Sequence, residues 1–133
     1  MNFGVKRILG KTGLKIGRIG IFDVFHTRYN AAHRGAEKDV FPFMNSENRA
    51  GLVTFVSTKN GKLLDPKKMP EREAPLSSVD CYRFILSNPA VDACMCGAKN
   101  AKQMKENLKT LDMGPLNEEE MARIRRIGDY LHK

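Results

Sequence analysis

A glycine turn followed by a lysine-rich helix start is the part of this sequence best suited to chemistry. Residues 87–107, SNPAVDACMCGAKNAKQMKEN, predict an apolar strand that Gly97 ends and a helix that Asn100 begins. A helix N-terminus attracts anions because its backbone N–H groups are unpaired and the positive end of its dipole lies there. Lys99 adds a full positive charge, so the pattern predicts a phosphate site. The alternative is a simple strand-to-helix connection with a solvated basic face.

Three cysteines, Cys81, Cys94 and Cys96, are the other reactive groups. An odd number of cysteines without a secretory signal favours reduced thiols. Cys94 and Cys96 would share one face of the predicted strand, because strand side chains alternate. A zinc-type site needs a second Cys or His pair, and none follows nearby, so we predict no metal centre.

Length and composition favour one domain of ordinary globular type. The chain has 133 residues, of which 41% are hydrophobic and 29% charged. It contains neither an apolar run long enough to span a membrane nor a signal-peptide pattern, so we expect a cytoplasmic protein without a membrane partner. The net charge of +8 is concentrated in residues 1–18 and 99–109. Because no nucleic-acid-binding motif accompanies these clusters, nucleic acid is an unlikely partner.

The first half of the chain predicts a hairpin and two buried strands. Lys11-Thr12-Gly13 lies between two short alternating runs, as in a hairpin turn. Residues 22–29 and 51–57 are rich in β-branched and aromatic residues, which favours buried strands. Residues 36–44 predict a short helix that Pro42 interrupts. The proline- and charge-rich residues 59–77 predict a long surface loop.

The second half of the chain alternates helix and strand. Ser77 or Ser78 can cap a helix over 79–87, and an apolar run predicts a strand over 91–96. A final helix should begin after Asn117, where three glutamates face the positive end of its dipole, and end near residue 131. Alternating strands and helices predict parallel βαβ units, and therefore an α/β fold.

Several segments, in the same order, resemble the aldo/keto reductase family. Residues 8–16, ILGKTGLKI, resemble its opening hairpin, and residues 29–37, YNAAHRGAE, its sixth barrel strand and following loop. Residues 51–61 are similar to the seventh strand and its cofactor loop, and residues 81–107 to the last helix, strand and cofactor turn. Gly114-Pro115-Leu116 and the final helix also fit.

The resemblance implies a partial (β/α) TIM-type barrel. Its parts would be an N-terminal hairpin, about three parallel strands with helices, and a C-terminal helix. We expect a single domain over 1–133, with a hairpin segment at 1–20 and a part at 21–133 that resembles the C-terminal portion of the family barrel.

The chain departs from the family at residues 20–22, where the hairpin runs almost directly into the sixth strand. In the family, the proton-donating Tyr and its Asp, Lys and His supporters come from the strands in between. Tyr29, Tyr82 and Tyr130 occupy other family positions, and His26 and His33 do not match the catalytic histidine. The resemblance therefore implies no catalytic residue, and we expect no independent reductase activity.

The same resemblance implies the residues of an NADP site. His26 stands where the family has a glutamine facing the nicotinamide amide, and Phe55 matches the aromatic that stacks on the nicotinamide. Ser57 and Thr58 fall in the pyrophosphate loop, with Lys62 nearby. The alternative for Phe55 is a place in the core of its strand.

The adenosine end of that site would lie at the glycine turn. Residues matching the turn around the 2′-phosphate are Gly97, Ala98, Lys99 and Asn100, and those matching the adenine contacts are Gln103, Glu106 and Asn107. Gln103 and Asn107 are four residues apart, so they would lie on one helix face. Their alternative role is helix capping and surface hydrogen bonding.

Two functions remain open from the sequence. The first is an aldo/keto reductase-like fragment that binds NADPH weakly and lacks reductase activity. The second is a non-catalytic binding or interaction module that uses its basic surface, with nucleic acid as one candidate partner. A partial parallel sheet leaves open edges, so we expect self-association or association with a complementary barrel fragment.

Overall fold

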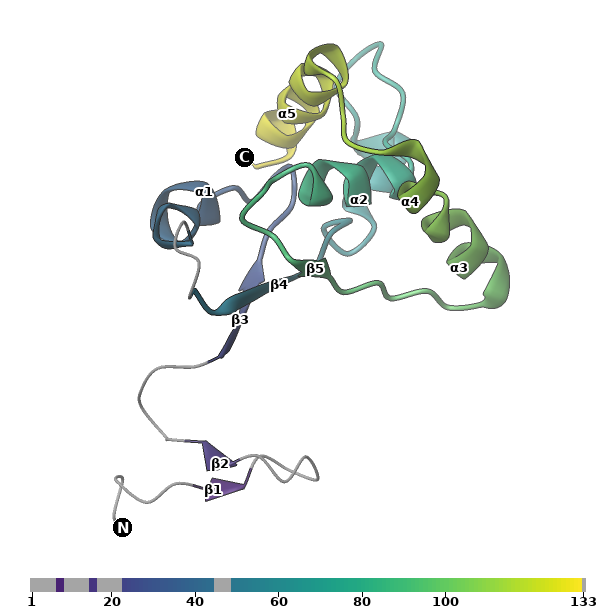
Figure 1. Cartoon of the computed structure of the whole chain (residues 1–133). Helices are drawn as coiled ribbons and strands as arrows, with labels where there is room; N and C mark the ends of the chain where they lie inside the picture. Colours follow the sequence, from purple (N-terminus) through teal and green to yellow (C-terminus); the bar gives the residue numbers. More distant parts are fainter. Residues whose placement is uncertain (1–6, 9–14, 17–22, 45–48, 133) are drawn as a thin grey trace.

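The computed structural model describes residues 7–8, 15–16, 23–44 and 49–132, and these form two separate sheets (Figure 1). Strands β1 (Arg7–Ile8) and β2 (Lys15–Ile16) pair antiparallel, as the predicted hairpin requires. The hairpin turn itself lies outside the described residues. The second sheet is parallel, with strand order β3-β4-β5, which confirms the predicted α/β class.

The parallel sheet consists of β3 (Val24–Arg28), β4 (Gly51–Phe55) and β5 (Ala93–Cys94). β5 is shorter than the strand predicted over 91–96. The side chain of Asp92, rather than backbone, accepts from Leu52 N–H at 2.7 Å, and Arg49 clamps the same carboxylate at 2.5 and 2.8 Å. Beyond Met95, whose N–H donates to Thr54 O at 2.8 Å, the chain leaves the sheet.

The two long strands differ in burial, and the prediction of a buried strand over 22–29 is wrong for β3. Val24 is 50% exposed and Phe25 43%, whereas Leu52 and Thr54 of β4 are fully buried. β3 is an edge strand whose described sheet neighbour is β4 alone. Its composition resembles that of a central strand, but β3 lies at the edge of the described sheet. Burial resumes at Tyr29 and Asn30, where the chain enters the core.

Helix α2 (Ser78–Leu86) is the most deeply buried helix of the described chain. Ser77 caps it as predicted: its Oγ accepts from Asp80 N–H at 3.0 Å, and the Asp80 carboxylate accepts from Ser77 N–H at 2.9 Å. The rings of Phe84 and Tyr29 stack with their centroids 5.5 Å apart. Helix α2 therefore packs against Tyr29, the residue that follows β3, and joins this end of the sheet to the core.

Helix α5 (Glu118–His132) covers the loop after β3 and also begins as predicted. Glu120 N–H donates to Asn117 Oδ1 at 2.8 Å, which starts the helix. Ile127 is fully buried, and the backbone at Gly128 lies so close to Ala31 that a Cβ there would be 2.1 Å from the Ala31 carbonyl oxygen. Only glycine permits this approach.

Shorter elements complete the fold. The predicted interrupted helix is α1 (Ala36–Asp39) followed by a 3₁₀ turn over Phe41–Phe43 that contains Pro42. The predicted surface loop at 59–77 contains two 3₁₀ turns, Lys62–Leu64 and Pro66–Lys68. It is also anchored in the core through Leu63, which is fully buried, and Leu76, so a purely surface loop was a wrong prediction.

Helices α3 (Ala101–Leu108) and α4 (Thr110–Met113) lie at the far end of the sheet from β3 (Figure 1). No residue of α3 is buried, and its cap residue Asn100 is exposed. Within the described residues, no helix is both long and apolar enough to cross a membrane.

Candidate functional site

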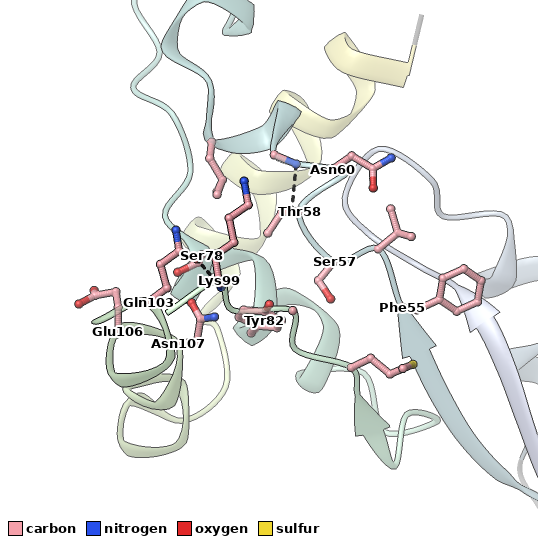
Figure 2. Close-up of a pocket in the computed structure, with 15 residues that line it drawn as sticks. Phe55, Ser57, Thr58, Asn60, Ser78, Tyr82, Lys99, Gln103, Glu106 and Asn107 are labelled. Atoms are coloured by element: carbon pink, nitrogen blue, oxygen red, sulfur yellow. Dashed lines mark hydrogen bonds between the residues drawn. The ribbon is translucent and has the colours of Figure 1, made fainter. Parts of the chain in front are cut away.

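A surface hollow of about 650 Å³ lies between the loop after β4, helix α2 and helix α3 (Figure 2). Its walls come from segments far apart in the sequence. β4 pairs with β5, so the loop after β4 and the turn after β5 lie next to each other. Eight of the twelve predicted cofactor residues line it: Phe55, Ser57, Thr58, Gly97, Lys99, Gln103, Glu106 and Asn107. The glycine turn and the loop after β4 thus meet in one place.

The other four predicted residues do not line the hollow. His26 lies on β3, which is separated from β5 and α3 by β4. Asn100 is used as the cap of α3, its Oδ1 accepting from Gln103 N–H at 2.9 Å. Lys62 is exposed in its 3₁₀ turn, and Ala98 is half-buried within the glycine turn. None of the four contributes to the lining of the hollow.

Seven further lining residues were not predicted: Val56, Asn60, Gly61, Leu64, Ser78, Tyr82 and Met95. The helical spacing of the sequence could have identified two of these residues. Ser78 and Tyr82 are four residues apart on α2, so they share the helix face that the predicted turn must cross. The others depend on how the loop after β4 folds, which no local pattern predicts.

Tyr82 and Asn107 hold the glycine turn in place. Asn107 Nδ2 donates to Cys96 Sγ at 3.0 Å, and the Lys99 N–H donates to Gln103 Oε1 at 2.9 Å. Burial and the neighbouring Cys96 raise the pKa of Tyr82, whose hydroxyl contacts the turn. The predicted alternative role of Gln103 in capping is therefore confirmed, and Asn107 also serves the turn.

Gly97 contributes open space rather than an unusual backbone conformation. A Cβ placed there would meet no atom within 4 Å, and its φ is not in the left-handed region. Gly61, on the opposite wall, is equally open but has φ 83°. A ligand could therefore approach the backbone closely on both sides of the hollow.

The loop after β4 stores backbone strain at the edge of the hollow. Val56 has φ 61°, which is an outlier for a β-branched residue and costs about 1–3 kcal/mol. The fully buried Asn30 compensates, since its Nδ2 donates to Val56 O at 2.9 Å. The loop is further fixed by Gly61 N–H donating to Thr58 Oγ1 at 3.1 Å, and by Lys59 Nζ donating to Leu131 O.

Charge in the hollow is carried mainly by Lys99. Figure 2 shows its side chain extending from the turn into the space between α3 and the Thr58–Asn60 loop. Among the described residues, Lys99 forms no ion pair, whereas Glu106 is paired with Lys109 at 2.6 Å. The hollow therefore presents a positive charge that an anionic ligand group could neutralise.

Two thiols lie behind the hollow wall. Cys94 Sγ is 2.9 Å from Ser57 Oγ, and burial raises the pKa of the Cys94 thiol. Burial also raises the pKa of Cys81 to about 12. Burial therefore favours the protonated form of both thiols. No group of three His, Cys, Asp or Glu side chains within the described residues is arranged to hold a metal ion.

Comparison with known proteins gives a family resemblance for part of this site. The aldo/keto reductase family model matches residues 76–129, which include α2, β5, the glycine turn and α3. The matched segment, which is less than half of the chain, is similar to the aldo/keto reductase family. No curated protein sequence matches the chain.

Solved structures agree on the fold. The aldo-keto reductase AKR11C1 from Bacillus halodurans, in its holo and apo forms, matches with a TM-score of 0.59 and 18% sequence identity. Each match covers 78% of this chain but 42% of the solved chain. The chain therefore has the fold of a partial (β/α) barrel and spans less than half the length of the solved chains that it matches.

Proposed function

We propose that the hollow binds NADPH weakly and that the chain has no reductase activity of its own. One observation carries the proposal. The residues that the family resemblance assigns to NADPH lie in separate stretches of sequence, and eight of them line one hollow. If these residues had structural roles alone, there would be no reason for them to line one hollow.

The residues present fit a dinucleotide phosphate. The hollow volume of about 650 Å³ falls in the range of ordinary ligand sites, which is roughly 300–1,000 Å³. Lys99 would face the 2′-phosphate, Ser57 and Thr58 the pyrophosphate, and Gln103 with Asn107 the adenine. When bound, such a cofactor supplies hydride transfer.

The absence of reductase activity is proposed because neither Tyr29 nor Tyr82 is placed to serve as proton donor, and Tyr130 does not line the hollow. The Tyr29 hydroxyl is buried and donates to Glu37 Oε1 at 2.7 Å. Tyr82 lines the hollow, but its hydroxyl is engaged with the glycine turn. Hydride transfer to a carbonyl requires an acid for the developing alkoxide, and the described lining of the hollow offers no free tyrosine for that role.

NADPH titration of the wild type, Lys99→Ala and Lys102→Ala by calorimetry tests the binding. Lys102 is the matched control, because it sits on α3 but does not line the hollow. Loss of a charge-assisted contact of about 1.5–3 kcal/mol should weaken binding roughly 10- to 100-fold in Lys99→Ala. Lys102→Ala should bind as the wild type does. No wild-type binding at millimolar NADPH, or equal losses in both variants, would refute the site.

A second variant tests the shape of the hollow without removing a charge. Gly97→Leu places a side chain where a Cβ meets nothing and where φ is not left-handed, so the fold should tolerate it. The side chain would occupy the hollow and abolish NADPH binding, with the unfolding midpoint unchanged. Undiminished binding would place the ligand elsewhere.

A second candidate function is an interaction module that uses the basic face of α3. Lys102, Lys105 and Lys109 surround a separate shallow hollow of about 420 Å³ on the outward side of the helix. Duplex DNA binding that weakens steeply with salt, and is lost in the triple Lys→Glu variant, would favour it. Binding of NADPH with no duplex binding would exclude it.

A further inference from the structure

We propose that five basic side chains, gathered where β3, β4 and α5 end, bind a tetrahedral oxyanion of the phosphate or sulfate class. These side chains form the basic cluster: Arg28, His33, Lys59, Lys62 and His132. None of them lines the hollow between β4, α2 and α3. The proposal is therefore independent of NADPH binding.

Contacts with backbone carbonyls bring three members of the basic cluster together. Lys59 Nζ donates to Leu131 O, the carbonyl that precedes His132. His132 Nδ1 lies 2.5 Å from Ala32 O, the carbonyl that precedes His33. The rings of His33 and His132 meet edge to face, with their centroids 5.5 Å apart. The loop after β3, the loop after β4 and the end of α5 thus converge on one place.

The other two members add positive charge at this place. Burial lowers the pKa of His33, and the neighbouring charges of Lys59, Arg28, His132 and Lys62 lower it further. Burial also lowers the pKa of Lys59, as do Lys62 and Arg28. All of these neighbouring charges are positive, so they disfavour further protonation. A bound anion would have the opposite effect and favour the charged forms.

The basic cluster has no acidic counterpart in the part of the chain that the structure describes. None of its members forms an ion pair there. Two acids close to its histidines in sequence are already occupied: Asp129 pairs with Arg34 at 2.5 Å, and Glu37 with Arg125 at 2.8 Å. Like charges held together destabilise a fold. Proteins keep such unfavourable arrangements mainly at functional sites, where a ligand offsets the repulsion.

The donor types indicate the class of ligand. Guanidinium and ammonium groups, and a protonated imidazole, have only N–H donors. A ligand that satisfies donors arriving from three elements must therefore carry acceptors on several sides and a matching negative charge. Phosphate and sulfate dianions have four oxygens arranged in this way, and charge-assisted hydrogen bonds to them are strong. Binding should strengthen as the pH falls, because His33 then becomes protonated.

Histidine C2-proton NMR of the full chain tests the basic cluster. Sulfate is the first probe, because histidine titrates between about pH 5 and 8 and sulfate does not. Sulfate should raise the pKa of His33, since a bound dianion favours the imidazolium. Sodium chloride at the same ionic strength is the control and should raise it much less. No response of His33 to sulfate, or an equal response to chloride, would overturn the proposal.

Two double variants with the same loss of charge locate the bound ion. Arg28→Gln/Lys62→Gln removes two exposed members of the basic cluster and should weaken sulfate binding roughly 5- to 10-fold. Lys67→Gln/Lys68→Gln is the matched control, because these exposed lysines lie in the next 3₁₀ turn and are not among the charges that act on His33. It should bind sulfate as the wild type does. Equal losses in the two double variants would overturn the proposal.

Two further measurements separate the basic cluster from the hollow and identify the form of the ligand. Lys99→Ala removes the charge of the hollow and should leave the response of His33 to sulfate intact. Loss of that response would place the ion in the hollow and overturn the proposal. Tighter binding of glycerol phosphate than of inorganic phosphate would assign the basic cluster to an esterified phosphate group, and the reverse order to the free ion.

Discussion

Helices α2 and α3 are both short, capped and amphipathic, yet they have opposite places in the molecule. α2 buries six of its residues, including Phe84 and Ile85, whereas α3 buries none. Both have an N-terminal cap made by a side chain, Ser77 for α2 and Asn100 for α3. Similar side-chain caps thus begin one mainly apolar helix that builds the core and one mainly polar helix that lines a hollow.

This difference separates what stabilises the fold from what serves the site. Helix stability in proteins comes mostly from packing of the apolar face, which α2 has and α3 lacks. Elements that bind ligands are drawn from the less stable end of a structure. We therefore expect α3 to open locally while α2 opens only with the whole molecule.

Core truncation gives the largest expected contrast. Phe84→Ala should lower the free energy of unfolding by about 3–5 kcal/mol, because it leaves a cavity beside Tyr29. Leu108→Ala should cost less than about 1 kcal/mol, since half of that side chain is already exposed. Urea denaturation of the two variants measures both. Similar losses would show that α3 is as much a part of the core as α2.

Removal of the two caps gives a smaller and more discriminating contrast. Ser77→Ala and Asn100→Ala each remove one cap hydrogen bond, worth about 1 kcal/mol to its helix. For α2 this loss should appear in global unfolding. For α3 it should appear in faster hydrogen exchange of the α3 amides, with global stability nearly unchanged. An Asn100→Ala variant that loses as much global stability as Ser77→Ala would contradict the comparison.

Lowering the pH gives the smallest expected effect on folding stability. Arg83, which donates to Glu120 at 2.7 and 3.0 Å and to Gly114 O at 2.9 Å, holds the pKa of Glu120 below its usual value. The folded state therefore gains stability above the ordinary glutamate value of about 4.3, and loses it as the pH falls toward the lowered pKa.

Glutamine variants isolate that contribution. Glu120→Gln should flatten the loss of stability in this acid window, because the α2–α5 ion pair no longer titrates. Glu106→Gln is the control: its pair with Lys109 is exposed at the surface of α3 and should leave the acid profile unchanged. Thermal unfolding between pH 3 and pH 6 compares them. An identical profile for Glu120→Gln and the wild type would show that the Arg83–Glu120 ion pair does not contribute to the acid dependence.

The caps and helix starts were predictable because they depend on neighbours in sequence. Ser77, Asn100 and Asn117 each cap a helix through a residue three positions away, and all three agree with the structure. The parallel order of the strands followed from their alternation with helices. Family resemblance added most of the hollow, since the turn and the loop after β4 carried matching motifs.

Burial was less predictable because it depends on what covers an element. The apolar composition of β3 favoured a central position, but β3 is an exposed edge. Leu63 stands in a proline-rich, charged stretch typical of a surface loop, and yet it is fully buried against the core. His26 matched the site by resemblance, but the sheet order places it on the far side of β4.

The sequence by itself determined the local parts: the glycine turn, the capped helices, and the positive charge at Lys99. These depend on contacts within about one helical turn, which the residue types already specify. The tertiary structure alone decided that Val56 adopts a strained conformation held by Asn30, that Tyr82 supports the turn, and that the apolar sides of β3 and α3–α4 are exposed. These features depend on which distant segments meet, and that is settled by packing of the whole chain rather than by any stretch of it.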